Sequence, residues 1–175
     1  MPGNRDAAAA GAFVIMQSMK PTVYVETSVI SYLTSRYSRD LVLAAHQQVT
    51  HQWWDTARDR FDLLISPMVQ DEMAQGDPDA VKLRLAAARK LRILPMTDDV
   101  LERVINLTHS LGLPKKALAD IYQIAYCVVY QIDFLVTWNC THIANPRVLR
   151  RLRDLANEET FFLLTIVTPD SLLED

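Results

Sequence analysis

Glycine and cysteine are both scarce in this sequence, and their scarcity argues against several common kinds of site. Its four glycines frame neither a G-x-G-x-x-G nor a G-x-x-x-x-G-K loop, so a dinucleotide- or phosphate-binding loop of these types is not indicated. Cys127 and Cys140 form no C-x-x-C pair, and the four histidines have no H-E-x-x-H spacing. The sequence therefore indicates neither a disulfide framework nor a zinc site, and it fits the reducing cytoplasm.

An excess of positive charge is also absent. The chain has 18 Lys and Arg residues against 21 Asp and Glu residues, which gives a formal net charge of −3. This balance argues against a broad positive field that binds nucleic acid, so any such contact must be local. The apolar runs are too short to span a bilayer, and we expect no membrane partner.

The length of 175 residues, half of them hydrophobic, is enough for one domain with a proper core. Residues 7–16 faintly resemble the apolar part of a signal peptide, but Arg5 is offset by Asp6 and no convincing cleavage site follows. We therefore expect a flexible N-terminal extension over residues 1–20 and a single domain over residues 21–175.

Short apolar runs alternate with stretches of helical periodicity along the rest of the chain. Because the runs are continuously apolar and rich in β-branched residues, they predict strands of a parallel sheet that is covered on both faces. The fold class is therefore α/β, with a central, mostly parallel sheet of about five strands. The predicted strands cover residues 22–25, 62–66, 91–94, 133–138 and 161–168.

Glu26 follows the first of these strands and is the first candidate site residue. An acid at the carboxyl end of a strand lies where open α/β sheets bind ligands. The alternative is a plain helix-capping turn, but Glu is a poor cap, and Thr27 or Ser28 is predicted to fill that role. We therefore favour a functional role for Glu26.

Other oxygen-bearing side chains follow the later strands. Glu72 is preferred to Asp71 because it lies four residues after Met68 on the same helix face. Asp120 lies on or beside the inward face of a helix predicted over residues 115–130. Each acid alone has an ordinary explanation, as a solvated helix residue or as a partner of the helix dipole. Together, three acids at one edge repel one another unless they are protonated or a cation holds them.

Thr137 and Asn139 leave the fourth strand at the same edge, although Asn139 alone is also a common turn residue. A set of ligands with oxygen donors only suits Mg²⁺ or Mn²⁺. Such ions bind phosphate oxygens and activate water, so the pattern indicates hydrolysis of phosphodiester or phosphoryl groups.

At these residues the sequence resembles the PIN-domain family, and within it the VapC-like toxins of bacterial type II toxin–antitoxin systems. The resemblance spans about residues 21–169, and it is carried by the order and spacing of several short motifs. These are Tyr24-Val-Glu-Thr-Ser-Val-Ile-Ser-Tyr-Leu33, Ser66-Pro-Met-Val-Gln-Asp-Glu72, Ala119-Asp120 with Ile124-Ala125, and Asp133-Phe-Leu-Val-Thr-Trp-Asn139 with His142-Ile-Ala-Asn145.

The resemblance implies a three-layer αβα sandwich, a Mg²⁺- or Mn²⁺-dependent ribonuclease site, a homodimer and an antitoxin encoded beside the protein. It places Glu26, Glu72 and Asp120 in the acidic metal site, with Ser28 and Thr137 as supporting hydroxyls. The family often favours structured RNA such as tRNA.

Three positions depart from the family pattern. Family members usually have Asp where this chain has Glu26, and commonly have a fourth Asp where it has Asn139. The amide oxygen of Asn139 can ligate a metal, but it adds no charge. Residues 121–123 replace a segment that often carries a histidine.

Lys116 and Arg147 are the candidate contacts to RNA, because each lies close in sequence to a candidate site residue. The other arginines of the helix after Asn145 are more simply explained as a solvated face. His142 is a candidate for phosphate contact, with capping or packing as equal alternatives.

Two functions follow for the whole chain. The first is an endoribonuclease that acts as the toxin of a toxin–antitoxin pair. The second is a catalytically weak module that binds RNA or a protein. A small-molecule phosphohydrolase is disfavoured, because such an enzyme needs an Asp nucleophile where Glu26 stands.

Overall fold

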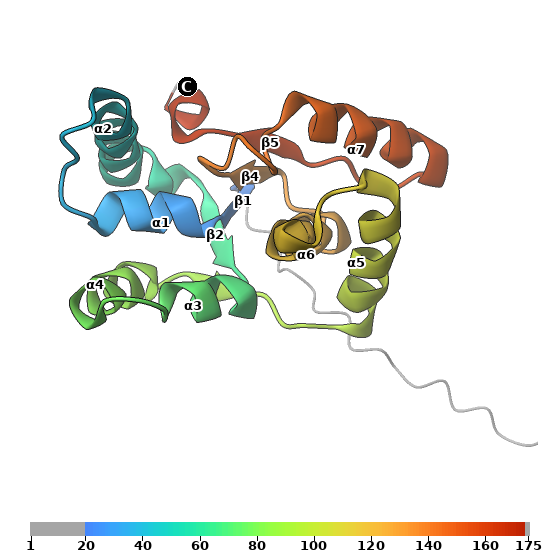
Figure 1. Ribbon diagram of the computed structural model, residues 1–175, viewed down its shortest axis with the longest axis horizontal. Coiled ribbons are helices and arrows are strands. Elements are labelled where there is room, and N and C mark those ends of the chain that lie inside the picture. The colour runs from blue at the N-terminus through green and yellow to red at the C-terminus, as the bar shows by residue number, and fades with distance from the viewer. Residues whose placement is uncertain (1–19, 174–175) are drawn as a thin grey trace, which may run out of the picture.

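Five short apolar runs form one sheet in the computed structural model, which describes residues 20–173. Every strand pair is parallel, and the order across the sheet is β3-β2-β1-β4-β5 (Figure 1). The predicted parallel α/β sheet is thereby confirmed. The predicted extension of residues 1–20 lies outside the described residues, apart from Lys20. The strands are β1 (Thr22–Val25), β2 (Asp62–Ile65), β3 (Arg92–Ile93), β4 (Phe134–Val136) and β5 (Thr165–Val167).

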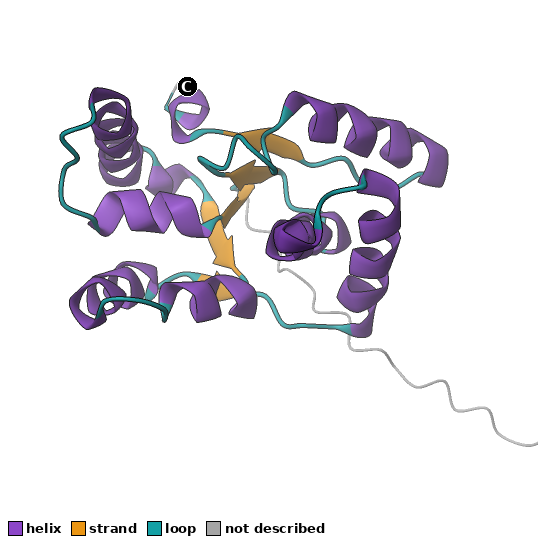
Figure 2. Ribbon diagram, in the orientation of Figure 1, coloured by secondary structure: helices purple, strands orange, loops and turns teal. Residues whose placement is uncertain are grey.

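The helices lie in two groups, one on each side of the strands (Figures 1 and 2). Helices α1 to α4 contact one another on one side, and α5 packs against both α6 and α7 on the other. The structure is thus the expected three-layer sandwich. No helix within residues 20–173 is both long and apolar enough to cross a membrane. The α-helices are α1 (Thr27–Thr34), α2 (Leu41–Thr56), α3 (Pro67–Met73), α4 (Pro78–Ala88), α5 (Asp98–Leu111), α6 (Leu118–Val129) and α7 (Pro146–Glu159).

Short polar side chains cap the helices that follow β2 and β3. The Ser66 hydroxyl accepts a hydrogen bond from Val69 N–H at the start of α3, and the Asp77 carboxylate accepts from two N–H groups of α4. The Thr97 hydroxyl caps α5 in the same way. These side chains satisfy amide groups that have no partner inside the helix, and so they determine where each helix begins.

The core surrounds β1, the central strand. Its residues Val23, Tyr24 and Val25 are fully buried between the two helix layers. Trp53 and Trp54 of α2 are both buried and belong to this core. Burial of these large side chains on both faces of the sheet makes its short strands rigid.

The strand order reverses direction at β1, and this reversal positions the candidate site. From β1 the chain runs outward through β2 to β3, and it then returns to place β4 and β5 on the other side of β1. Ligands bind open parallel sheets at such a switch point, beyond the carboxyl ends of the strands. Glu26 follows β1 and Thr137 follows β4, so both residues leave the sheet at this point.

Three predicted elements differ from the structure by more than one residue at an end. The strand predicted over residues 133–138 is shorter, since β4 covers only Phe134–Val136. The strand predicted over residues 161–168 is shorter, because β4 spans only three residues and its register pairs them with Thr165–Val167. Nothing in the sheet remains for residues 161–164 to pair with. The helix predicted over residues 115–130 begins instead with a 3₁₀ turn, Lys115–Ala117, before α6 starts at Leu118.

Candidate active site

Glu26 is the residue on which the two central strands converge. Its backbone N–H donates to Val136 O at 3.1 Å, which extends the pairing of β1 with β4 by one residue. Its side chain also caps α1, because a carboxylate oxygen accepts from Ser28 N–H at 3.0 Å. The prediction that Thr27 or Ser28 caps this helix is therefore wrong. The Glu26 side chain itself caps the helix, because its carboxylate reaches the N–H group two residues further along the chain.

The Glu26 carboxylate is buried and is surrounded by hydroxyl donors. The Thr137 hydroxyl donates to Glu26 Oε2 at 2.8 Å, and the Ser28 hydroxyl donates to the same oxygen. Burial raises the pKa of Glu26 above its ordinary value, the two hydroxyls act in the opposite direction, and the nearby Glu72 carboxylate raises it again. Ser28 and Thr137, predicted as supporting hydroxyls, both contact this acid.

The same two hydroxyls also hold the turn that follows β4. Ser28 Oγ accepts from Trp138 N–H at 2.9 Å, and Thr137 Oγ1 accepts from Asn139 N–H at 2.8 Å. Each hydroxyl therefore links Glu26 to the backbone of the turn. This arrangement fixes the position of Asn139 relative to the acid.

Glu72 approaches from α3. Asp71 is exposed and Met73 is buried, so the partly buried Glu72 lies between these two faces of the helix, as the spacing predicts. The Thr27 hydroxyl donates to Glu72 Oε2. Burial raises the pKa of Glu72, Thr27 acts in the opposite direction, and the Asp120 carboxylate raises it further.

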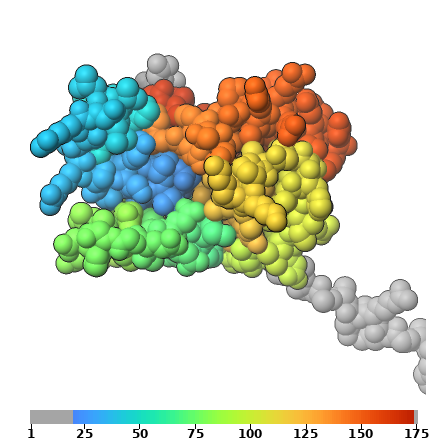
Figure 3. Space-filling view, in the orientation of Figure 1, coloured from blue at the N-terminus to red at the C-terminus, as the bar shows by residue number. Residues whose placement is uncertain are grey.

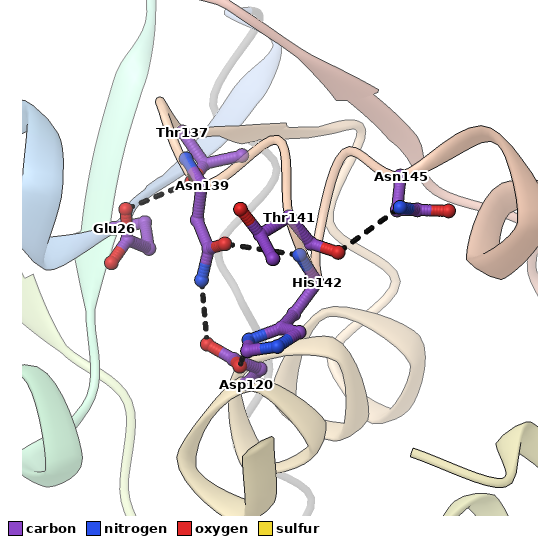
Figure 4. Close-up of polar contacts among 7 residues, drawn as sticks. All are labelled: Glu26, Asp120, Thr137, Asn139, Thr141, His142 and Asn145. Atoms are coloured by element: carbon purple, nitrogen blue, oxygen red, sulfur yellow. Dashed lines mark hydrogen bonds and ion pairs between the residues drawn. The ribbon is translucent and has the colours of Figure 1, made fainter. Parts of the chain in front are cut away.

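Asp120 lies in the first turn of α6 and is buried, with both carboxylate oxygens engaged. Asn139 Nδ2 donates to Oδ1 at 2.9 Å, and His142 Nδ1 lies 3.0 Å from Oδ2 (Figure 4). Burial raises the pKa of Asp120, while His142 and Asn139 act in the opposite direction. Because Glu72 interacts with both Glu26 and Asp120, the three acids form one electrostatic group.

In the space-filling view, the segments that carry these acids come together near the middle of one face (Figure 3). Blue residues of the α1 segment, green residues of α3 and yellow residues of α6 meet there. The acids are far apart in sequence, so their approach is a product of the fold.

The fold is similar to that of a solved chain in the structure of VapBC-1 from nontypeable Haemophilus influenzae. The TM-score is 0.54, with 12% sequence identity over 85% of this chain and 98% of that chain. The fold is PIN-like and VapC-like. A scan against protein-family models gives no match, and a search of the curated proteins gives none either. The likeness to VapBC-1 thus lies in the three-dimensional arrangement and hardly in the sequence.

The charges of the acid group in this VapC-like fold have no lysine or arginine partner among the described residues, and the imidazole of His142 contacts Asp120 alone. Within residues 20–173, no lysine or arginine forms a salt bridge with Glu26, Glu72 or Asp120. All three offer carboxylate oxygens, the donors that hard divalent cations prefer. The chemistry of the donor set therefore fits Mg²⁺ or Mn²⁺.

The side chains are nevertheless not gathered around a metal position. Among the described residues, no group of three His, Cys, Asp or Glu side chains is arranged to hold a metal ion. The physical reason is that each acid is hydrogen-bonded to its own neighbours: Glu26 to Ser28 and Thr137, Glu72 to Thr27, and Asp120 to Asn139 and His142.

Asn139, predicted as a metal ligand, uses its amide group within the site. Its Oδ1 accepts from His142 N–H at 3.1 Å, while its NH₂ group donates to Asp120 (Figure 4). An amide oxygen has two lone pairs, so one remains for another partner. In this geometry the first role of Asn139 is to position Asp120.

The contact of His142 with Asp120 could not be found from the sequence alone. No motif links the two residues, and the turn that brings the imidazole back over α6 is defined by the Asn139 bond to His142 N–H. An imidazole thus reaches the acid group from the loop after β4, although residues 121–123 of α6 lack a histidine.

Lys116 and Arg147, predicted as contacts to RNA, are both exposed and lie on either side of Asp120 in sequence. Lys116 belongs to the 3₁₀ turn that leads into α6, the helix of Asp120. Arg147 lies in the first turn of α7, where its N–H donates to Asn145 Oδ1 at 2.9 Å. Their contact with a substrate remains a prediction.

Proposed function

We propose that this protein is a Mg²⁺- or Mn²⁺-dependent endoribonuclease and the toxin of a toxin–antitoxin pair. One observation carries the proposal: Glu26, Glu72 and Asp120 form an electrostatic group, with no lysine or arginine of residues 20–173 paired to it, at the switch point of a VapC-like sheet. Charges of the same sign are costly when they are brought together, and such an arrangement is typical of a functional site.

In this proposal Glu26, Glu72 and Asp120 hold the metal, with the free lone pair of Asn139 as a further ligand. A bound divalent ion supplies positive charge for the phosphate and lowers the pKa of coordinated water. Thr137 and Ser28 keep the Glu26 carboxylate oriented through their hydroxyls. Asn139 does the same for Asp120 through its NH₂ group.

The partners follow from the same proposal. Lys116 and Arg147 bind the RNA backbone, with tRNA as a candidate substrate, in the cytoplasm. A cognate antitoxin controls the activity, and the protein forms a homodimer. The likeness to a chain of VapBC-1 supports a toxin of this type.

The test is an RNA cleavage assay with purified protein in Mn²⁺, in Mg²⁺ and in EDTA. The wild-type protein cleaves RNA with either ion, EDTA stops cleavage, and neither Glu26→Gln nor Asp120→Asn cleaves, although both variants fold. Wild-type rates in either variant would show that the site assignment is wrong.

The second candidate is a catalytically weak module that binds RNA or a protein. Two observations favour it. Among the described residues, no three His, Cys, Asp or Glu side chains are arranged to hold a metal, and both carboxylate oxygens of Asp120 already have partners in the chain. Calorimetric titration separates the candidates. A nuclease should bind Mn²⁺ at millimolar concentration or below, and Glu26→Gln should weaken this binding. A module without a metal site should give no heat of binding when Mn²⁺ is added.

A further inference from the structure

A cavity of about 590 Å³ lies beside the acid group, between the start of α7 and the end of α5. It is distinct from the acid group, because none of the three carboxylates lines it. Six of its ten lining residues are polar or charged, and the others are apolar residues or glycine. The residues that matter are Gly112, Thr141, Asn145, Arg147, Arg150 and Arg151.

Arginines face this cavity because of the helical period of α7. The buried side of α7 is made by Val148, Leu152 and Ala156, which recur every four residues. Arginines 147, 150 and 151, together with Asp154, recur at three- and four-residue steps beside that buried stripe and line the cavity. Three positive charges thus share the cavity with a single negative one.

Arg151 is fixed in the wall by the end of α5. Its Nη1 donates to Leu111 O at 2.5 Å, and the next residue, Gly112, has the left-handed φ of 60°. A Cβ at Gly112 would lie 2.9 Å from Arg151 Nη1, so glycine is what allows the guanidinium to approach. The fold therefore holds one positive charge in place.

Unlike Arg151, Arg147 and Arg150 are not held in place by a hydrogen bond from the side chain to the described part of the protein. Both are exposed, and within residues 20–173 neither side chain has an ion pair or a hydrogen bond. Two unpaired guanidinium groups beside a third, fixed one make a cavity that attracts anions.

One turn connects this cavity with the acid group. At its start, Asn139 holds Asp120, and at its end Asn145 donates to Thr141 O at 3.1 Å and caps α7 (Figure 4). Thr141 and Asn145 line the cavity, while Asn139 and His142 contact Asp120. The cavity and the contacts of Asp120 are therefore formed by neighbouring residues of one turn.

We propose that this cavity binds backbone phosphates of single-stranded RNA next to the phosphate held at the acid group. The inference rests on the proposed function, because the acid group itself repels a polyanion and a neighbouring positive site offsets that repulsion. RNA is favoured over an acidic protein segment because the cavity continues the path from the acid group. A substrate strand must follow that path, whereas a protein partner need not.

The experiment measures binding without cleavage. A fluorescently labelled single-stranded RNA is titrated by anisotropy in EDTA, with Glu26→Gln as the background for every protein. Arg147→Gln/Arg150→Gln is compared with Arg89→Gln/Arg153→Gln, which removes the same charge at exposed residues that do not line this cavity. Circular dichroism checks that both variants fold, and Arg150→Gln alone serves as a milder variant.

The cavity variant should bind RNA at least about tenfold more weakly than the control variant. The slope of log K against log salt should also fall by about 1.4, because each lost phosphate contact on a single strand contributes about 0.7. Equal affinities and equal slopes for the two double variants would overturn the inference, and so would the failure of the background protein to bind RNA.

Two further outcomes separate this inference from the nuclease proposal. If the wild-type protein binds RNA through the cavity but does not cleave it in Mn²⁺, the nuclease proposal is wrong and the cavity inference stands. If the wild type cleaves RNA and the cavity variant binds RNA as tightly as its control, the nuclease proposal stands and the cavity inference is wrong. A polyglutamate peptide that displaces RNA more strongly than unlabelled RNA does, at equal charge, would assign the cavity to an acidic protein instead.

Discussion

Carboxylates at the two edges of the same parallel sheet differ in the partners that the fold gives them. At the amino edge, Asp62 at the start of β2 forms a 2.8 Å salt bridge with Arg92 of β3. Asp133, just before β4, accepts from both the N–H and the hydroxyl of Thr22 at 2.8 Å. These acids connect neighbouring strands, and their partners match them in charge or in hydrogen bonds.

At the carboxyl edge, Glu26, Glu72 and Asp120 have hydroxyls, one backbone N–H, the Asn139 amide and the His142 imidazole as partners, and burial raises the pKa of each. Within residues 20–173, none of the three forms a salt bridge with a lysine or arginine, as Asp62 does. The contrast shows that acids at a strand end indicate function when the fold gathers several of them and gives none a lysine or arginine partner. Four measurements can break or sharpen this comparison.

The largest effect should come from the carboxyl edge. Glu72→Gln should lower the RNA cleavage rate in Mn²⁺ by at least about 100-fold, because it removes one of three negative charges that would hold the metal. Its neighbour Asp71 is exposed and provides the control, and Asp71→Asn should cleave within about twofold of wild type. Similar rates for the two variants would remove Glu72 from the site.

A smaller effect is expected from a hydroxyl that supports Glu26. Thr137→Val keeps the side-chain shape but removes the donor to Glu26 Oε2, and cleavage should fall by about tenfold. Because this hydrogen bond lowers the pKa of Glu26, its loss raises that pKa. The acid limb of the pH–rate profile should therefore move to higher pH. An unchanged limb would show that Glu26 does not control the profile.

The amino edge should respond in stability and not in activity. Arg92→Gln removes the partner of Asp62 and should lower the free energy of unfolding by about 1 kcal/mol, as expected for a partly exposed ion pair. Urea denaturation measures the change, and RNA cleavage should stay at the wild-type rate. Loss of cleavage at unchanged stability would mean that the two edges do not have separate roles.

The smallest effect concerns the pH dependence of stability. Since burial raises the pKa of Glu26 above about 4.5, the folded protein binds more protons than the unfolded chain between that pH and the raised pKa. The wild type therefore loses stability as pH rises through this interval, and Glu26→Gln lacks this loss.

Urea denaturation at several values from roughly pH 4 to pH 8 measures this difference. The stability of Glu26→Gln relative to wild type should increase with pH, but only modestly, because Ser28 and Thr137 offset part of the burial effect. Glu158→Gln, at an exposed position of α7, should show no such trend. A difference that stays constant with pH would mean that the pKa of Glu26 is not raised.

Much of the fold could be read from local sequence, because its signals are local. The continuously apolar β1 predicts a strand covered on both faces, and the adjacent residues Val23 and Tyr24, which point to opposite faces, are both buried. Ser66-Pro67 is a pattern typical of a helix start, and α3 begins there. Strand ends are less certain from sequence. Residues 161–164 are apolar enough for a strand, yet β4 is too short to pair with them.

Glu26, Glu72 and Asp120 could be named as acids at strand ends or in the first turns of helices from the order of the residues alone. Chain order does not say which strands are neighbours, and it was the placement of β4 beside β1 that brought Thr137 onto Glu26. The contacts of Asn139 and His142 with Asp120 also depend on the tertiary structure, since side-chain hydrogen bonds form only when packing of the layers brings the groups within reach. Local propensity acts over a few residues, so it determined the elements, whereas the electrostatics of the acid group required the whole chain to fold.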